Sequence, residues 1–376
     1  MDHHHPSPSP LLLLLLLSIS TCINSTTPLT PSLHSPYLSP SLFFPTYYQM
    51  LQHLQIFIYT NQTSSLTSTP QSLFHTSLLN SPFTTTNGNK AHLFYLLFPT
   101  NSTYKAISKL IKDLQTEFPF WNRTLGADHF YVSCSGVPYV SDRNIVELKK
   151  NSIQVSCFPS IEEVGRFQFI PHKDITLPSL VNYVDDHVDT TSNSMKKYIG
   201  YLQRTISTTD IGFMHELRKD SNFLIQYKAD DDDEKLLISK FCLFFYGDIS
   251  MANIGKALRY GCVPVVITNR PIKLDLPFMD VLKWTEFTVF LEAREGVKGM
   301  KMVLKHICKR GDYEKMRSIA IKASKHFVWS SASPQPYDAF HTILYQLWVR
   351  RHAIRYARRE YVNVEDALSA LANNYI

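Results

Sequence analysis

Runs of consecutive apolar residues alternate with helix-like stretches from about residue 50 onward. Four runs are typical of buried strands, over residues 54–59, 91–98, 128–132 and 153–157. Between the second and third runs, apolar residues recur at Ile107, Leu110, Ile111 and Leu114, which is the spacing of one helix face. Strands that alternate with helices predict an α/β fold built on a parallel, doubly wound sheet.

The second half of the chain contains a predicted strand, helix and strand in close succession. The strands cover residues 241–245 and 262–267, and a short helix over residues 251–260 ends at Gly261. In such a unit, backbone N–H groups after the first strand favour an anion, such as the diphosphate of a nucleotide. The loop with Tyr246 and Gly247 is therefore a candidate phosphate-binding loop. An ordinary unit without a ligand is the alternative.

Length and composition indicate a globular protein of two or three domains. The chain has 376 residues, of which 44% are hydrophobic. Its net charge of +6 falls short of the concentrated basic surface of a nucleic-acid binder, so no nucleic-acid partner is expected. A polar stretch over residues 185–193 separates two halves. We therefore predict an N-terminal domain over residues 49–185 and a C-terminal domain over residues 186–349.

The first 48 residues are expected to direct and tether the chain rather than to fold. No Asp, Glu, Lys or Arg occurs from His3 to Asn89. An apolar segment near residues 11–23 has the length of a signal-peptide core, so residues 1–23 are predicted to be a signal peptide or a signal anchor. Residues 24–48 are rich in Ser, Thr and Pro and suit a flexible stalk. The alternative is a low-complexity start without a targeting role.

Glycosylation sequons and cysteines give weaker evidence for a secretory location. Beside Asn24 at the start of the predicted stalk, the candidate glycosylation sites are Asn61, Asn101 and Asn122. The six cysteines show no metal-binding spacing. Loss of Cys22 with the leader leaves an odd number of cysteines, and the sequence does not show which of them pair. The acidic run over residues 230–234 favours a solvated connector over a Mg²⁺ site. No metal site is therefore predicted.

Several blocks of the sequence follow one another in a characteristic order. In the second half these are Ser239-Lys-Phe-Cys-Leu243, Gly261-Cys-Val-Pro-Val-Val-Ile267 and Val281-Leu-Lys-Trp284. In the first half they are Phe118-Pro-Phe-Trp-Asn-Arg-Thr-Leu-Gly-Ala-Asp-His-Phe130 and Phe169-Ile-Pro-His-Lys-Asp-Ile-Thr-Leu-Pro178. A third group contains Lys325-His-Phe-Val-Trp329 and Tyr337-Asp-Ala-Phe-His341. Together these blocks resemble the exostosin-type glycosyltransferases, in particular the plant branch that builds cell-wall polysaccharides.

The resemblance implies a fold, a reaction and a location. The fold is α/β with two Rossmann-like domains facing a cleft, of the GT-B type. The reaction transfers a sugar from a nucleotide-sugar co-substrate, expected to be UDP-linked, to a polysaccharide or glycoprotein acceptor, with no cofactor. The location is the Golgi membrane, with the N-terminal segment as anchor and the catalytic domain in the lumen. Related transferases are expected as partners in a hetero-oligomer.

The chain departs from the family pattern in the predicted donor-binding helix. The resemblance implies an arginine and a glutamate there, but Asn253 or Ile254 takes the place of the arginine and Lys256 that of the glutamate. Reversing a charge at a donor contact removes a hydrogen-bond acceptor. A catalytically inactive homologue that binds glycans or pairs with an active enzyme is therefore the alternative function.

Candidate catalytic residues follow from the chemistry of displacement at an anomeric carbon. A base must accept the proton of the acceptor hydroxyl, and Asp128 and His129 are the candidates on the acceptor side. Lys256 and Arg259 could neutralise the departing diphosphate. The alternatives are a turn cap, a buried structural histidine and a solvated helix face. Residues 350–376 are predicted to be a basic helical tail whose charges face solvent.

Overall fold

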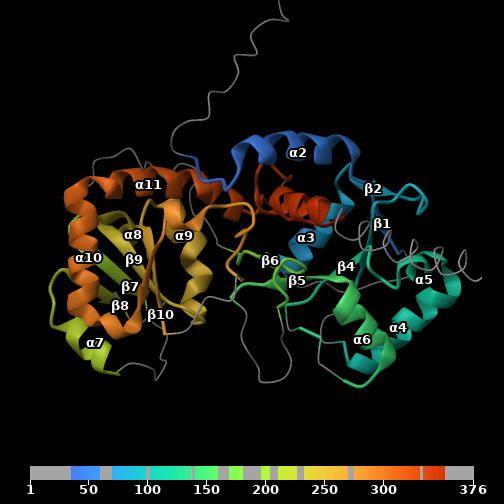
Figure 1. Ribbon diagram of the computed structural model, residues 1–376, viewed down its shortest axis with the longest axis horizontal. Helices are drawn as coiled ribbons and strands as arrows, with labels where there is room; N and C mark the ends of the chain where they lie inside the picture. The colour runs from blue at the N-terminus through green and yellow to red at the C-terminus, as the bar shows by residue number, and fades with distance from the viewer. Residues whose placement is uncertain are drawn as a thin grey trace, which may run out of the picture. The chain divides into compact units, whose positions relative to one another are not determined.

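A computed structural model of the protein describes the parts of the chain that are coloured in Figure 1. These are residues 35–59, 70–98, 102–134, 136–137, 140–159, 169–180, 196–203, 211–226, 233–269, 275–330 and 333–351. From Pro36 onward they belong to one compact unit. The predicted signal segment, residues 1–23, and most of the predicted stalk lie outside the described residues. No helix in the described ranges is long and apolar enough to cross a membrane.

A six-stranded parallel sheet forms the first half. Its strand order is β2-β1-β3-β4-β5-β6. The strands are β1 (Ile56–Ile58), β2 (Thr84–Thr85), β3 (Leu93–Leu96), β4 (His129–Val132), β5 (Ile153–Cys157) and β6 (Ile175–Leu177). The helices are α3 (Pro70–Leu79), α4 (Tyr104–Glu117), α5 (Phe120–Thr124) and α6 (Arg143–Asn151). The four predicted strand runs and the predicted helix are thereby confirmed.

A five-stranded parallel sheet forms the second half, in the order β11-β10-β9-β7-β8. The strands are β7 (Tyr198–Gln203), β8 (Phe223–Gln226), β9 (Ser239–Phe245), β10 (Val263–Thr268) and β11 (Val289–Glu292). The longer helical elements are α7 (Ile211–Arg218), α8 (Asp233–Ile238), η1 (Ile249–Asn253), α9 (Ile254–Arg259), α10 (Gly296–Arg310) and α11 (Asp312–Ala323). The predicted strand, helix and strand correspond to β9, η1 with α9, and β10.

Both sheets share one topology. In each, the second strand lies on one side of the first, and the third and later strands lie on the other side. This is a doubly wound order: after the second strand, the chain crosses over the first strand and adds the remaining strands on its other side. The predicted α/β class with two Rossmann-like parallel sheets is confirmed. The predicted boundary falls in residues outside the description, between β6 and β7.

Helix α2 (Pro40–His53) overlaps the predicted stalk over residues 24–48, so the stalk prediction is wrong where the helix begins. Pro40 opens the helix, where its missing N–H costs no hydrogen bond. Phe43, Tyr47 and Met50 recur at helical spacing and are buried. Upstream of the helix, the Leu38 N–H donates to the Val281 carbonyl over 2.9 Å. Residues 36–48 are therefore part of the folded unit, because this face buries large side chains.

A C-terminal helix over residues 339–351 carries the chain back to the first sheet. Phe340 packs against Phe74 of α3, and Tyr345 packs against Phe43 of α2 with ring centroids 4.7 Å apart. Arg350 is buried at the end of this helix. Arg351 is buried as well. The expectation that the charges of the basic tail face solvent is therefore wrong for both arginines, and residues 352–376 lie outside the description.

Two disulfides link neighbouring strands. Cys134 follows β4 and is bonded to Cys157 at the end of β5. Cys242 in β9 is bonded to Cys262 just before β10. Cys308 on α10 is a free thiol, so the expected odd cysteine is Cys308 among the described residues.

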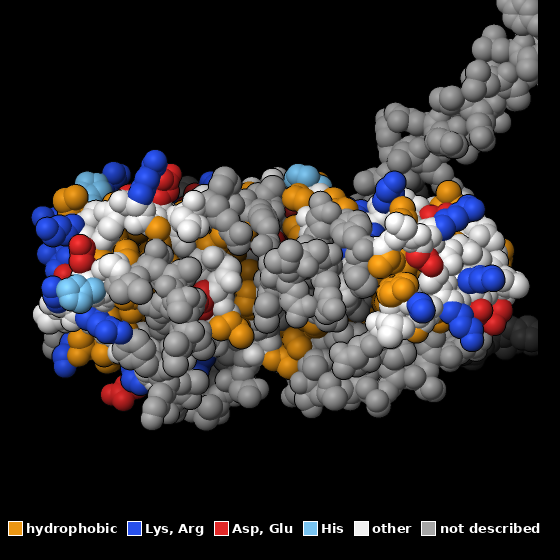
Figure 2. Space-filling view, turned by 90° about the horizontal axis from the view of Figure 1, so that it is seen from below, with side chains coloured by type: hydrophobic (Ala, Val, Ile, Leu, Met, Phe, Trp, Pro, Cys, Tyr) orange, Lys and Arg blue, Asp and Glu red, His pale blue; other side chains and the backbone are white. Residues whose placement is uncertain are grey.

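Charged side chains on the surface are mixed in sign. On the face in Figure 2, Lys and Arg side chains lie interspersed with Asp and Glu over the described residues at both flanks. The described part of this face therefore matches the modest net charge of the chain.

Candidate functional site

The strand order of the second sheet places a crevice at the carboxyl ends of β7 and β9. These strands are neighbours, but the connections that follow them lead to opposite sides of the sheet. In open parallel sheets, ligands bind at this point because the diverging connections leave space outside the strand ends. The crevice is the candidate functional site.

Gln203 and Asn253 join the two sides of the crevice. Gln203 ends β7, and Asn253 lies in η1 after β9. The Asn253 Nδ2 donates to Gln203 Oε1 over 2.6 Å. This bond fixes both amide groups at the carboxyl edge of the sheet. Of these two residues, the sequence predicts only Asn253 as a donor-binding residue.

The loop after β9 adopts the turn that its glycine predicts. Gly247 has φ +84°, a left-handed conformation that residues with a side chain seldom adopt. The Tyr246 hydroxyl leaves this loop and donates to Asp275 Oδ1 over 2.6 Å. Tyr246 is therefore held by a neighbouring segment.

Asp248 occupies the position where an anion was expected. Its Oδ1 accepts the Ser250 N–H over 2.8 Å and caps η1. A carboxylate at the start of a helix satisfies N–H groups that a phosphate would otherwise bind. The protein's own side chain therefore takes one of the predicted phosphate contacts.

Lys256 lies in the crevice and forms an ion pair with Asp233 of α8. The two side chains are only 16% and 19% exposed. The remaining cavity beside them is about 10 Å³, which is room for about one water molecule. Among the described residues that line this cavity, Lys256 is the one cation, and Asp233 compensates its charge.

Arg259 is not brought to the same edge. It is the last residue of α9, and β10 begins four residues later. In a strand-helix-strand unit the helix runs back toward the amino ends of the strands. The geometry therefore separates Arg259 from the loop that contains Tyr246 and Gly247.

Asp128 and His129 form a buried structural cluster in the first sheet. His129 is fully buried. Its Nδ1 lies 2.8 Å from Asp128 Oδ1, and its Nε2 lies 2.8 Å from the Tyr59 hydroxyl. Because a carboxylate only accepts, Nδ1 carries the proton and Nε2 accepts from Tyr59. The rings of Phe94 and Trp121 pack around the imidazole.

The electrostatics of this pair also favour the structural alternative. Burial lowers the pKa of His129, although the Asp128 carboxylate acts in the opposite direction. For Asp128, burial raises the pKa, but hydrogen bonds from His129 and Thr124 outweigh it and the net shift is downward. Both residues lie at the amino end of β4, away from the carboxyl ends where ligands bind. The geometry thus gives no support to the proposed catalytic role.

Of the candidate glycosylation sites, only Asn122 is described. It is exposed on α5, and its Nδ2 donates to the Gln115 carbonyl over 3.0 Å. Asn61 and Asn101 lie outside the described residues. Glycosylation at all three positions stays a prediction.

Sequence reasoning missed Gln203, Asp233 and Asp248 as functional candidates. Asp233 belongs to the acidic run that the sequence predicts to be a solvated connector, and it lies 23 positions before Lys256. The loop signal at Gly247 contained Asp248, a typical helix-capping residue. No group of three or more potential metal ligands occurs within the described ranges.

Comparison with known proteins identifies the family. The Exostosin GT47 domain model matches residues 48–307. The chain belongs to the exostosin GT47 family. The match runs from α2 to α10 and contains both parallel sheets.

The named relatives of this exostosin GT47 protein come from plants. One is Probable glycosyltransferase At5g03795 of Arabidopsis thaliana, 27% identical over 351 residues, which cover 84% of this chain and 65% of that protein. The chain thus spans slightly less than two thirds of that relative. Another is Probable beta-1,4-xylosyltransferase IRX10 of Arabidopsis thaliana, 26% identical over 312 residues, with 72% of each chain covered.

A solved structure of MurG from Acinetobacter baumannii is a distant match. It is 10% identical, has a TM-score of 0.29, and the alignment covers 73% of this chain and 76% of that chain. The fold of the exostosin GT47 chain is therefore assigned from its own strand orders.

Proposed function

We propose that this exostosin GT47 protein is a glycosyltransferase that uses a nucleotide sugar, expected to be UDP-linked. The acceptor is a cell-wall polysaccharide or a glycoprotein glycan. The family match over residues 48–307 carries the proposal, because it contains both doubly wound sheets. The names of the plant relatives support a sugar-transfer reaction.

The donor would bind at the crevice of the second sheet. Lys256 is the cation at its edge, and a nucleoside diphosphate would compete with Asp233 for it. In the reaction, the acceptor oxygen bonds to the anomeric carbon while the bond from that carbon to the diphosphate breaks. The hydroxyl proton passes to a base, and Lys256 stabilises the negative charge of the leaving diphosphate.

The proposed location is the lumen of the Golgi, with the N-terminal segment as membrane anchor. The disulfides Cys134–Cys157 and Cys242–Cys262 support an oxidising compartment. The apolar segment near residues 11–23 supports entry into the secretory pathway.

Calorimetric titration of the full chain with UDP and with GDP tests the donor site. Wild-type protein is expected to bind UDP with micromolar affinity, and Lys256→Met to bind at least tenfold more weakly. Lys109→Met, which changes an exposed lysine on α4, is the matched control and should bind like wild type. Absence of UDP binding, or equal affinity in Lys256→Met, would overturn the proposal.

An inactive homologue is the second candidate, favoured by the filled crevice. Lys256 is paired with Asp233, and Asp248 caps η1. Such a protein would bind glycans or an active relative without turnover. Mass spectrometry of oligosaccharides incubated with UDP-sugars separates the candidates. A product heavier by one sugar supports the transferase. No product, together with nucleotide binding only in Lys256→Glu combined with Asp233→Asn, supports a silenced donor site.

A further inference from the structure

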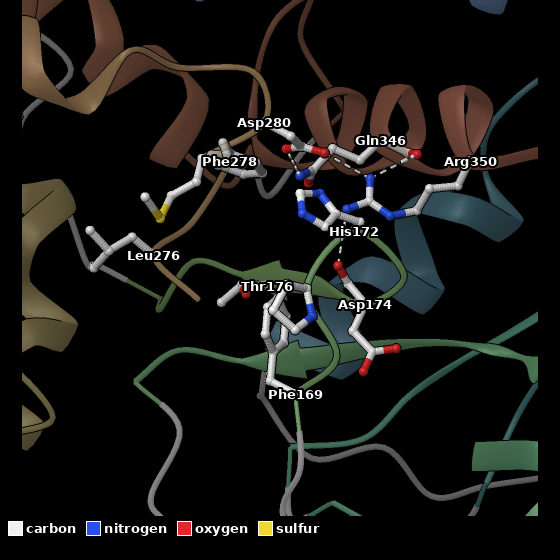
Figure 3. Close-up of a pocket in the computed structure, with 11 residues that line it drawn as sticks. Phe169, His172, Asp174, Thr176, Leu276, Phe278, Asp280, Gln346 and Arg350 are labelled. Atoms are coloured by element: carbon white, nitrogen blue, oxygen red, sulfur yellow. Dashed lines mark hydrogen bonds and ion pairs between the residues drawn. The ribbon is translucent and has the colours of Figure 1, made fainter. Parts of the chain in front are cut away.

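A second pocket lies beside β6 and has a volume of about 120 Å³. Three stretches that are far apart in sequence line it: residues 169–176, residues 276–280 and the C-terminal helix (Figure 3). Nothing in the proposed donor site uses this pocket. Its walls therefore bring together polar and charged side chains that lie far apart in the sequence.

Arg350 organises the pocket wall. Its Nε donates to the Lys173 carbonyl over 3.0 Å and its Nη2 to the Asp174 carbonyl over 3.0 Å. Its Nη1 lies 2.8 Å from Asp280 Oδ2, and the arginine side chain is only 10% exposed. The three stretches are thus bound to one buried guanidinium, and its charge is balanced by Asp280.

Gln346 leaves an acceptor without a partner at this wall. Its Nε2 donates to Asp280 Oδ1. Because the carboxylate only accepts, the amide orientation is fixed with Oε1 turned away from Asp280. Gln346 is 3% exposed, and its Oε1 has no hydrogen-bond partner among the described residues. A buried acceptor of this kind requires a donor, and a bound hydroxyl group would provide one.

Backbone strain is concentrated at the same place. His172 has φ +66° and Phe278 has φ +61°, and both line the pocket. Residues with a side chain rarely adopt this conformation, and such strain gathers at ligand-binding sites. His172 is exposed, and its ring lies near Gln346 and Asp280 in Figure 3. The exposed His172 imidazole therefore offers a hydrogen-bonding group to a ligand.

We propose that this pocket binds a neutral sugar ring of the acceptor glycan. The charged residues that line the pocket are each paired, Arg350 with Asp280 and Asp174 with Lys173, so an uncharged ligand fits better than an anion or a cation. An amide oxygen, a carboxylate and an imidazole suit sugar hydroxyls, and the partly exposed Phe169 and Met279 offer an apolar surface to the ring. Leu276 adjoins Asp275, which accepts from Tyr246 in the donor-site loop. The acceptor role rests on the proposed function, because only a transferase has an acceptor.

Titration with neutral oligosaccharides tests the pocket separately from the donor site. The probes are β-1,4-linked xylohexaose and cellohexaose, and UDP is titrated in parallel. Wild type should bind at least one oligosaccharide. Gln346→Met should weaken that binding at least tenfold while leaving UDP affinity unchanged.

Two further variants keep the test valid if Gln346→Met does not fold. His172→Asn changes an exposed residue and keeps a side chain that tolerates positive φ, and it should weaken oligosaccharide binding several-fold. His215→Asn, on the exposed face of α7, is the matched control and should bind like wild type. Melting temperatures establish that each variant is folded.

The outcomes separate this proposal from the proposed function. UDP binding without oligosaccharide binding overturns the pocket proposal and leaves the transferase standing. Oligosaccharide binding that His172→Asn and Gln346→Met weaken, without UDP binding, supports the pocket and overturns the donor site. Equal oligosaccharide affinity in wild type and both variants overturns the pocket proposal.

Discussion

Lys256 of α9 and Asp233 of α8 form a largely buried ion pair at the carboxyl edge of the second sheet. Lys256 stands where the family resemblance implies an acidic residue. The opposite charge is therefore present in the crevice, but it comes from a residue 23 positions earlier in the chain. The pair gives the crevice both a cation for a diphosphate and a carboxylate that competes for it.

Reversing the charge of Lys256 alone should destabilise the protein. Lys256→Glu places two carboxylates together, and we expect a loss of about 1–3 kcal/mol in the free energy of unfolding. Asp233→Lys alone should cost a similar amount, and the double variant should recover most of it. Urea denaturation of the four proteins measures this coupling. Additive losses in the double variant would show that the two side chains do not interact.

The Asp128 and His129 cluster should matter for stability and not for chemistry. His129→Ala removes a buried ring that contacts Phe94 and Trp121, so we expect a loss of about 2–4 kcal/mol in the free energy of unfolding. Asp128→Asn should cost less, because the amide still accepts from His129. UDP affinity at a temperature where the variants are folded should equal that of wild type. A folded Asp128→Asn protein that binds UDP normally but transfers no sugar would instead assign a catalytic role.

The buried His326 should make the fold sensitive to acid. Its Nδ1 lies 2.7 Å from Thr342 Oγ1 and its Nε2 lies 3.1 Å from the Tyr37 hydroxyl. Burial lowers the pKa of His326 from 6.5 to about 3, although Asp338 acts in the opposite direction. The unfolded chain therefore binds this proton first as the pH falls.

The stabilisation from His326 is complete above pH 6.5 and is lost as the pH falls toward about 3. The expected slope is about 1.4 kcal/mol per pH unit. Urea denaturation from pH 7 to pH 4.5 measures it, and His326→Gln should flatten the profile relative to wild type. His215→Gln, at an exposed position, is the control. Parallel profiles for wild type and His326→Gln would contradict the prediction.

The cysteines should divide into two disulfides and one thiol within the described chain. Peptide mapping without reduction should yield Cys134–Cys157 and Cys242–Cys262, and an alkylating reagent should label Cys308. Sequence separations of 23 and 20 residues predict about 3 kcal/mol of stabilisation from each disulfide. Urea denaturation of Cys242→Ser combined with Cys262→Ser measures one of these contributions. Mixed pairs that include Cys308 would contradict the assignment.

The strands with continuous apolar runs could be predicted from sequence. Phe241 to Phe245 and Val263 to Ile267 are apolar and too short for a buried helix, which favours a buried strand. The sequence prediction misses helix α2 because the helix directly follows a stretch rich in Ser, Thr and Pro and itself contains Pro40 and Pro45, a composition typical of a stalk. The spacing of Phe43, Tyr47 and Met50 was the signal of a buried helix face.

The candidate sites depend on contacts that no local pattern contains. The ion pair of Lys256 with Asp233 joins α9 to α8, and neither residue indicates the other in the sequence. The second pocket needs Asp280, Gln346 and Arg350 to meet the loop before β6. Such long-range contacts arise from the whole fold, whereas loops such as that of Gly247 are specified by adjacent residues.

Hydrogen-deuterium exchange with and without UDP locates the donor site most directly. Amides in residues 245–257 and at the end of β7 should exchange more slowly with UDP, and those in residues 128–133 should be unchanged. Lys256→Met should abolish the protection, whereas Lys109→Met should retain it. Protection confined to residues 128–133, or none in the second sheet at saturating UDP, would contradict a donor site at the carboxyl ends of β7 and β9.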